Sequence, residues 1–459
     1  AGTKLVDAGN WFVTDTWQMP DDLISGVYLA KLVREDGTFG ESRIPFIVRD
    51  DSSTSDVIFQ TADTTWQAYN PWGGQNLYTG AKAVSYNRPF ALDIPEPVNT
   101  TLYGPESYLF GAEYAAIRWL EKNGYDVTYQ SGLDTAVRGD QLLNHDVFLS
   151  VGHDEYWSAA QRDNVEAARD AGINLMFWSG NEVFWKTRWD AGITGESNKT
   201  LITYKESNIG SQPDPSSEWT GLWRDQRGLA EGGGDPENTL TGTRFAANLG
   251  TSLSTLEVPY DLSKLRIWDN TDISNLSPGE TWESNGPYLG YEWDIAPNDE
   301  FRPAGLIELS ATTRDSPFIF QNERAGLNYA PGEATHSLTL YRADSGALVF
   351  GAGTVFWSWA LDDFHVFGPV GPIGPTPTDP NIEQAMVNLF AEMGVQPGSL
   401  TFYLVPGEKS TDFYTGSSVI SDVFNGISFG AGSTVTLTGT AEDIGGGVIA
   451  GVEVSTDGG

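Results

Sequence analysis

The segment at residues 146–189 decides the predicted fold; it reads DVFLSVGHDEYWSAAQRDNVEAARDAGINLMFWSGNEVFWKTRW. Its two apolar runs, at 147–151 and 173–177, are typical of strands buried on both faces of a parallel sheet. Between them, Ser158 begins a capping-box pattern, and Gly172 stands where helices commonly end. The segment therefore predicts a strand–helix–strand unit with a right-handed crossover.

Polar residues follow each of these two strands. The first strand is followed by His153, Asp154 and Glu155, and the second by Asn181 and Glu182. A loop histidine beside acidic residues is usually no more than a hydrogen-bonded side chain. Ligands of open α/β sheets, however, bind at the carboxyl ends of the strands. We therefore predict one site built from both polar elbows.

The preceding chain extends the same alternation. Strands are predicted at 26–33, 56–61 and 126–132, and a helix at 111–125. Residues 64–78, TTWQAYNPWGGQNLY, are predicted to form an aromatic, glycine-rich loop. Alternating strands and helices indicate a parallel sheet.

Beyond the opening segment, residues 186–300 are rich in Gly, Pro, Asn and Asp, and we expect ordered loop insertions over the site. Strands are predicted again at 337–343 and 347–353, followed by a helix at 381–394. After residue 397, Val and Thr alternate, which is typical of a β-sandwich.

We thus expect an α/β domain over residues 1–396, with its core at about 56–395 and a mostly parallel sheet. A truncated Ig-like or fibronectin-like β-sandwich module is expected to begin at 397–459. Because the chain stops within a strand-like pattern, we expect it to be part of a longer protein.

Composition narrows the function. The 459 residues carry 62 acidic and 26 basic side chains, a net charge of −36. Such a charge opposes binding to nucleic-acid phosphates and anionic membranes. The absence of cysteine excludes disulfides, thiolate metal sites and a cysteine nucleophile, including that of a thiol glutaminase. No apolar run is long enough to insert into a membrane. We expect a secreted or cell-surface protein, either homo-oligomeric or linked to further extracellular domains.

Several motifs resemble the C-terminal catalytic domain of the N,N-dimethylformamidase large (beta) subunit. They are WQAYNPWGGQNLY (66–78), VSYNRPF (84–90), VGHDEYW (151–157), GNEVFW (180–185) and LGYEWD (289–294). The likeness covers roughly residues 4–395. It implies a glutamine-amidotransferase-like (flavodoxin-like) α/β fold and hydrolysis of N-substituted formamides at one ferric iron.

The resemblance also implies which residues form the site. Two tyrosines and a glutamate that bind iron in the family match Tyr28, Tyr69 and Glu155. Fe³⁺ is a hard cation that removes the phenol proton and prefers oxygen ligands. Tyr78 lies in the same aromatic stretch as Tyr69, and composition alone does not choose between them.

Catalytic roles are implied for His153, Asn181 and Glu292, while Lys205 is a weaker match to a family lysine and is left unassigned. We expect Glu292 to act as general base, and His153 and Asn181 to orient water or stabilise an oxyanion. The small-molecule substrate would be an amide. The alternative is an extracellular structural, adhesin-like or glycan-binding module that retains the fold without catalysis.

Overall fold

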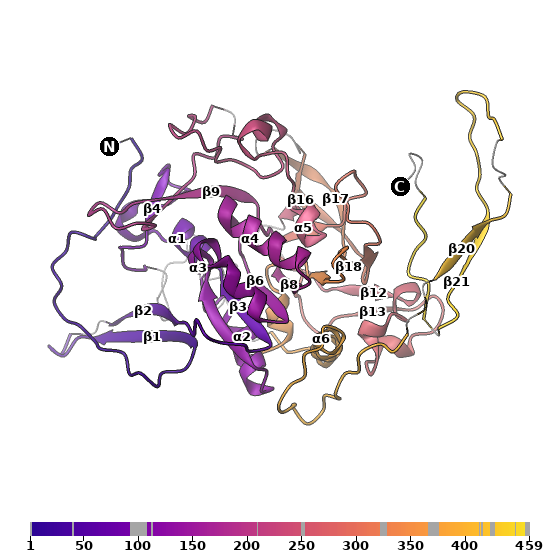
Figure 1. Ribbon diagram of the computed structural model, residues 1–459, viewed down its shortest axis with the longest axis horizontal. Coiled ribbons are helices and arrows are strands. Elements are labelled where there is room, and N and C mark those ends of the chain that lie inside the picture. The colour runs from indigo at the N-terminus through magenta and orange to yellow at the C-terminus, as the bar shows by residue number, and fades with distance from the viewer. Residues whose placement is uncertain are drawn as a thin grey trace.

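A computed structural model describes residues 2–38, 41–91, 108–111, 113–208, 210–248, 253–321, 328–365, 376–412, 414, 416–422, 427–445 and 447–454. It is a mixed α/β structure with several sheets, in which strands outnumber helices (Figure 1).

The centre of the molecule is a seven-stranded sheet. In spatial order its strands are β15 (Ile307–Glu308), β18 (Thr339–Arg342), β19 (Leu348–Gly351), β8 (Asn174–Ser179), β6 (Val147–Gly152), β3 (Val57–Thr61) and β5 (Val127–Ser131). The strands from β19 to β5 are parallel, whereas β18 is antiparallel to β19 and β15 to β18. The predicted parallel sheet is confirmed at this level. Every residue of β3 and β6 is buried, as their apolar runs predict.

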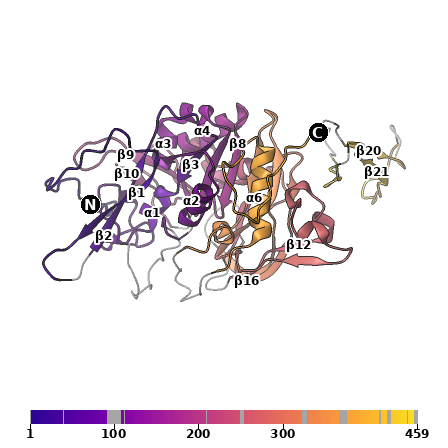
Figure 2. The same ribbon diagram turned by 90° about the horizontal axis from the view of Figure 1, so that it is seen from below.

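Helices flank this sheet (Figure 2). They are α1 (Asp63–Tyr69), α2 (Glu113–Lys122), α3 (Gly132–Val137), α4 (Ala159–Asp170), α5 (Asn238–Thr241) and α6 (Pro380–Glu392). Ser158 caps α4 as predicted, because its side chain accepts a hydrogen bond from the backbone N–H of Gln161. The reciprocal bond of a capping box is not formed, since the Gln161 side chain has no hydrogen-bond partner among the described residues. Short 3₁₀ turns occur at Trp72–Gly74, Gly139–Asn144, Gln226–Glu231, Tyr260–Leu262, Arg266–Trp268, Ile273–Asn275 and Trp357–Ala360.

The predicted loop at 64–78 is wrong over its first half. Helix α1 occupies Asp63–Tyr69, and all seven of its residues are buried. Its polar side chains have partners inside the protein: Asp63, for example, accepts hydrogen bonds from Tyr86, Thr61 and Gly132. Because these groups are paired, a polar segment can lie in the core.

The predicted insertion at 186–300 contributes two strands to a second, antiparallel sheet, and the other two strands follow it in the chain. In spatial order the strands are β14 (Glu292–Ile295), β11 (Arg244–Asn248), β16 (Thr312–Phe320) and β17 (Tyr329–His336). Its strand β14 bridges Trp293 to Thr354, just beyond β19 of the central sheet. The second sheet therefore abuts the carboxyl end of the first.

Smaller sheets complete the main body. One contains β4 (Ala83–Ser85), β10 (Thr200–Ile202), β9 (Trp185–Asp190) and β7 (Tyr156–Ser158). Two hairpins are formed by β1 (Gly26–Val33) with β2 (Glu41–Val48), and by β12 (Glu257–Pro259) with β13 (Thr281–Glu283). The first hairpin lies at the periphery in both views (Figures 1 and 2).

The C-terminal region carries one pair of strands among its described residues, β20 (Ser417–Ile420) and β21 (Gly439–Glu442). This pair projects from the main body (Figure 1). The predicted β-sandwich therefore stays a prediction, as does the division at residue 396. Within the described part of the chain, none of the helices is both long and apolar enough to cross a membrane.

Candidate functional site

The two polar elbows lie side by side. Strands β6 and β8 pair in register up to Gly152 and Ser179, so both chains leave the sheet at the same level. The backbone carbonyl of Glu155 then accepts hydrogen bonds from the N–H groups of Phe184 (3.0 Å) and Trp185 (2.8 Å). These bonds fasten the first elbow to the chain that follows the second.

Two tyrosine hydroxyls converge on Glu155, and we call Tyr69, Tyr78 and Glu155 the phenol–carboxylate cluster. The Tyr69 hydroxyl donates to Glu155 Oε2 at 2.9 Å. The Tyr78 hydroxyl lies 2.7 Å from that of Tyr69 and 3.0 Å from each carboxylate oxygen. Helix α1 carries Tyr69, and the turn after it carries Tyr78.

A hydrogen-bond chain supports this cluster from one side. The Tyr156 hydroxyl donates to the Tyr78 hydroxyl at 2.8 Å, and Lys205 Nζ donates to Tyr156 at 2.8 Å. Lys205 Nζ also lies 3.9 Å from the centre of the Tyr78 ring, a cation–π distance. Tyr156 is fully buried and Lys205 is 8% exposed.

His153, Asn181 and Glu292 form the other side of the site, which we call the histidine group. His153 Nε2 lies 3.0 Å from Glu292 Oε2 and 3.4 Å from Glu155 Oε2, joining the two carboxylates. Asn181 Nδ2 donates to Glu292 at 2.9 Å and lies 3.3 Å from His153 Nε2. Among the described residues, Asn181 Oδ1 is buried without a hydrogen-bond partner, which leaves an acceptor available inside the site.

Neighbouring side chains hold the histidine group in place. The Tyr291 hydroxyl lies 3.2 Å from His153 Nδ1, and Asn248 Nδ2 donates to Glu292 Oε1 at 3.0 Å. Asn248 and Glu292 come from β11 and β14, so the second sheet supplies this wall of the site.

Burial dominates the electrostatics. It raises the pKa of Glu155, an effect opposed by His153 and Lys205 and reinforced by the charge of Glu292. Burial and the Glu155 charge raise the pKa of Tyr69 and Tyr78 well above the ordinary value. Burial also lowers the pKa of Lys205 to about 8. Both phenols are therefore protonated at neutral pH unless a cation displaces their protons.

A second layer of buried acids lies beneath the elbows. The Ser150 hydroxyl lies 3.0 Å from Asp154 Oδ2 and 2.9 Å from Glu182 Oε1, and Gln60 Nε2 donates to Asp154 at 2.6 Å. Burial raises the pKa of Asp154 to about 7 and also raises that of Glu182. These carboxyl groups connect the two elbows through one serine.

Five of the six predicted site residues come together: Tyr69, His153, Glu155, Asn181 and Glu292. Tyr28 is not among them. It lies on β1, where its hydroxyl donates to the Ile24 carbonyl at 2.9 Å and its ring stacks on Phe46 at 5.7 Å. In this arrangement Tyr78 is the second phenol beside Glu155.

Tyr78, Tyr156, Tyr291 and Lys205 were not assigned from the sequence. Tyr156 and Tyr291 directly follow or precede assigned acids, in HDEYW and GYEWD, and that adjacency was the available signal. For Lys205, the resemblance to the family was the only indication in the sequence. Lys205 has a positive φ of 48°, which is uncommon for a lysine.

The donor set suits a hard cation. In the described part of the chain, no three His, Cys, Asp or Glu side chains are arranged to hold a metal ion, so phenol oxygens would have to contribute. Neighbouring oxygens around an octahedral cation with bonds of about 2.0–2.1 Å lie roughly 2.9 Å apart. The Tyr69 hydroxyl oxygen and Glu155 Oε2 are 2.9 Å apart, which matches this spacing.

The family model for the N,N-dimethylformamidase beta subunit-like C-terminal domain matches residues 1–370. The chain belongs to this family. The match includes every member of the phenol–carboxylate cluster and of the histidine group in this dimethylformamidase-like domain. No curated protein matches the chain.

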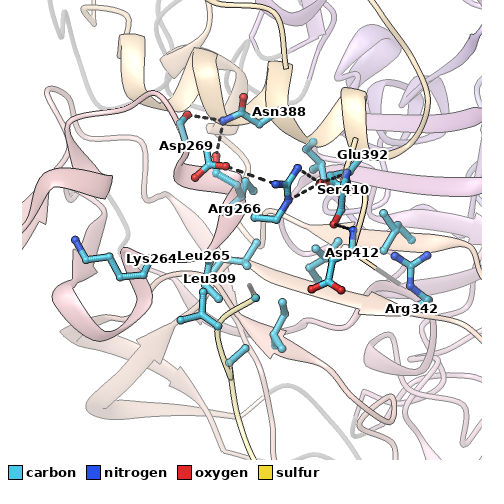
Figure 3. Close-up of a pocket in the computed structure, with 18 of the residues that line it drawn as sticks. Lys264, Leu265, Arg266, Asp269, Leu309, Arg342, Asn388, Glu392, Ser410 and Asp412 are labelled. Atoms are coloured by element: carbon cyan, nitrogen blue, oxygen red, sulfur yellow. Dashed lines mark hydrogen bonds and ion pairs between the residues drawn. The ribbon is translucent and has the colours of Figure 1, made fainter. Parts of the chain in front are cut away.

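A cavity of about 590 Å³ lies elsewhere, between α6 and the C-terminal segment (Figure 3). Arg266 Nη2 pairs there with Glu392 at 2.7 Å, and the Ser410 N–H donates to the same carboxylate. None of the predicted site residues lines this cavity. The cavity is lined in part by residues beyond the matched range, and it is separate from the phenol–carboxylate cluster and the histidine group.

Proposed function

We propose that the chain is an iron-dependent amidohydrolase that cleaves a non-peptide, formamide-type C–N bond. The observation that carries this proposal is the buried contact between the Tyr69 phenol oxygen and the Glu155 carboxylate, in a chain that belongs to a dimethylformamidase-related family. Tyr69 and Glu155 would hold the ion. Tyr28 is the further ligand implied by the resemblance, although in this structure it contacts Ile24 and Phe46 and not Glu155.

A bound Fe³⁺ would supply Lewis-acid polarisation of the amide carbonyl and lower the pKa of a bound water. The chain's residues perform the proton transfers. Glu292 is the general base, and its 3.0 Å contact with His153 gives the proton a path toward the leaving amine. Asn181 holds Glu292 through its amide N–H and presents its buried Oδ1 as an acceptor that can orient the attacking water.

The first test measures the metal content of the purified chain and of Tyr69→Phe. We expect about one iron per chain with a visible tyrosinate-to-iron charge-transfer band in the wild type, and loss of both in the variant, because the ring remains while the ligand oxygen is removed. Tyr86→Phe is the control. It removes a buried hydroxyl that donates to Asp63 outside the site. An iron-free wild type, or a variant with unchanged colour, contradicts the proposal.

Activity is tested with N-substituted formamides, by following amine release. Glu292→Gln should lower kcat by about 10²–10⁴-fold, the usual contribution of a positioned base. Its iron content should remain at the wild-type level, since Glu292 is not a proposed ligand. Iron binding without turnover of any formamide would leave the metal site standing and refute the substrate class.

A further inference from the structure

We propose that Tyr78 is a positioning residue, whose hydroxyl aligns the Tyr69 and Glu155 oxygens, and that Tyr156 orients Tyr78 for this task. This inference deepens the proposed function and rests on it. The family resemblance assigned no role to either tyrosine.

The contacts of the Tyr78 hydroxyl carry the argument. It lies within 3.0 Å of three oxygen atoms that belong to Tyr69 and Glu155. A hydroxyl has one proton to donate, so it can favour only one of these acceptors at a time. Tyr156 fills an acceptor position of the same hydroxyl at 2.8 Å, which restricts its rotation and directs its proton toward the cluster.

The packing fixes this geometry independently of any ion. The Tyr69 and Tyr78 rings lie 4.5 Å apart, and Tyr156 is fully buried against Tyr69. The Asn76 side chain accepts from the Tyr78 N–H at 2.9 Å and donates to the Tyr69 carbonyl at 2.9 Å. One asparagine therefore sets the spacing between the two tyrosines. Groups that orient metal ligands in this way tune the metal as well as the ligands.

The spectrum of the iron-loaded protein provides a test. When Tyr69 is a phenolate, the Tyr78 proton withdraws electron density from its oxygen. Removing that proton in Tyr78→Phe should make Tyr69 a stronger donor and move the charge-transfer band to longer wavelength. Tyr156→Phe should move the band in the same direction by less, because hydrogen-bond chains polarise their members cooperatively.

Tyr86→Phe is the matched control, since it loses one buried hydroxyl beside a carboxylate outside the site and should leave the band unchanged. Circular dichroism establishes that each variant is folded before its spectrum is compared. A Tyr78→Phe band at the wild-type wavelength, with wild-type iron content, overturns this inference alone. A wild type that binds no iron overturns the proposed function and this inference together.

Discussion

Asn181 shows how one residue serves both the backbone and the site. Its φ is +49°, a left-handed conformation that asparagine tolerates better than most residues. Its N–H donates to Asp294 at 2.8 Å, and its side chain holds Glu292. The left-handed turn and the contact with the proposed general base thus depend on the same residue.

These two roles separate in a pair of variants. Asn181→Gly and Asn181→Ala both lose the amide that holds Glu292 and should lower formamide turnover to a similar extent, by roughly 10–100-fold. Asn181→Ala should in addition be about 1 kcal/mol less stable than Asn181→Gly, because alanine resists positive φ. Denaturant unfolding and kinetics measure the two effects. Wild-type turnover in Asn181→Gly would show that the amide has no role in the reaction.

At the scale of elements, the elbow after β8 is tightly packed against the chain that leaves β19. A Cβ at Gly180 would lie 2.7–2.8 Å from backbone atoms of Thr354 and Val355. Backbone atoms cannot move aside as a side-chain end can, so glycine is required for this close approach.

We therefore expect Gly180→Ala to lower the free energy of unfolding by about 1–3 kcal/mol and to displace Asn181. Gly332→Ala on β17 is the control, because its nearest neighbour is Ile319 Cγ1 at an ordinary 3.4 Å. Urea unfolding compares the two. Equal stability of both variants would mean that the elbow relaxes without cost.

The sequence pattern predicts the central sheet far better than the second sheet. The short apolar runs of β3, β6 and β8 predict strands buried on both faces of a parallel sheet. The ends of the runs at β6 and β8 also predict where the two polar elbows begin. The second sheet combines short strands from the turn-rich insertion, such as β11, with half-exposed strands that follow the insertion, such as β16, so hydrophobic periodicity does not reveal it. Tyr78 escaped assignment because local composition does not show which phenol of an aromatic stretch reaches a carboxylate contributed 77 residues later.

At the scale of the whole molecule, several carboxyl groups are buried in a chain of net charge −36. Burial raises the pKa of Asp63 to about 6 and that of Asp154 and Asp294 to about 7. In the unfolded chain these groups titrate near ~3.9. The folded state therefore holds protons that the unfolded state has lost.

The contribution of these three carboxyl groups to the free energy of unfolding should therefore be greatest below about pH 4. It should be lost as the pH rises through their folded-state pKa values of about 6 and 7. We expect the iron-free chain to have a higher Tm at pH 5 than at pH 8. Each unit of pKa difference is worth about 1.4 kcal/mol, so Asp63 alone contributes roughly 3 kcal/mol. Asp63→Asn should flatten the profile in differential scanning calorimetry. A Tm that increases from pH 5 to pH 8 would contradict the burial of protonated acids.

The site lies where the two sheets meet, so different sheets hold its two sides. The phenol–carboxylate cluster lies at the end of β6 and on the segment around α1, beside the central sheet. The second sheet carries the other wall of the site, with Glu292 on β14 and Asn248 on β11. The bridge between Trp293 and Thr354 joins the two sheets beside the site, and His153 lies between the two carboxylates. A substitution that shifts β14 should therefore change the distance from Glu292, the proposed general base, to Glu155 and leave the phenol–carboxylate cluster intact.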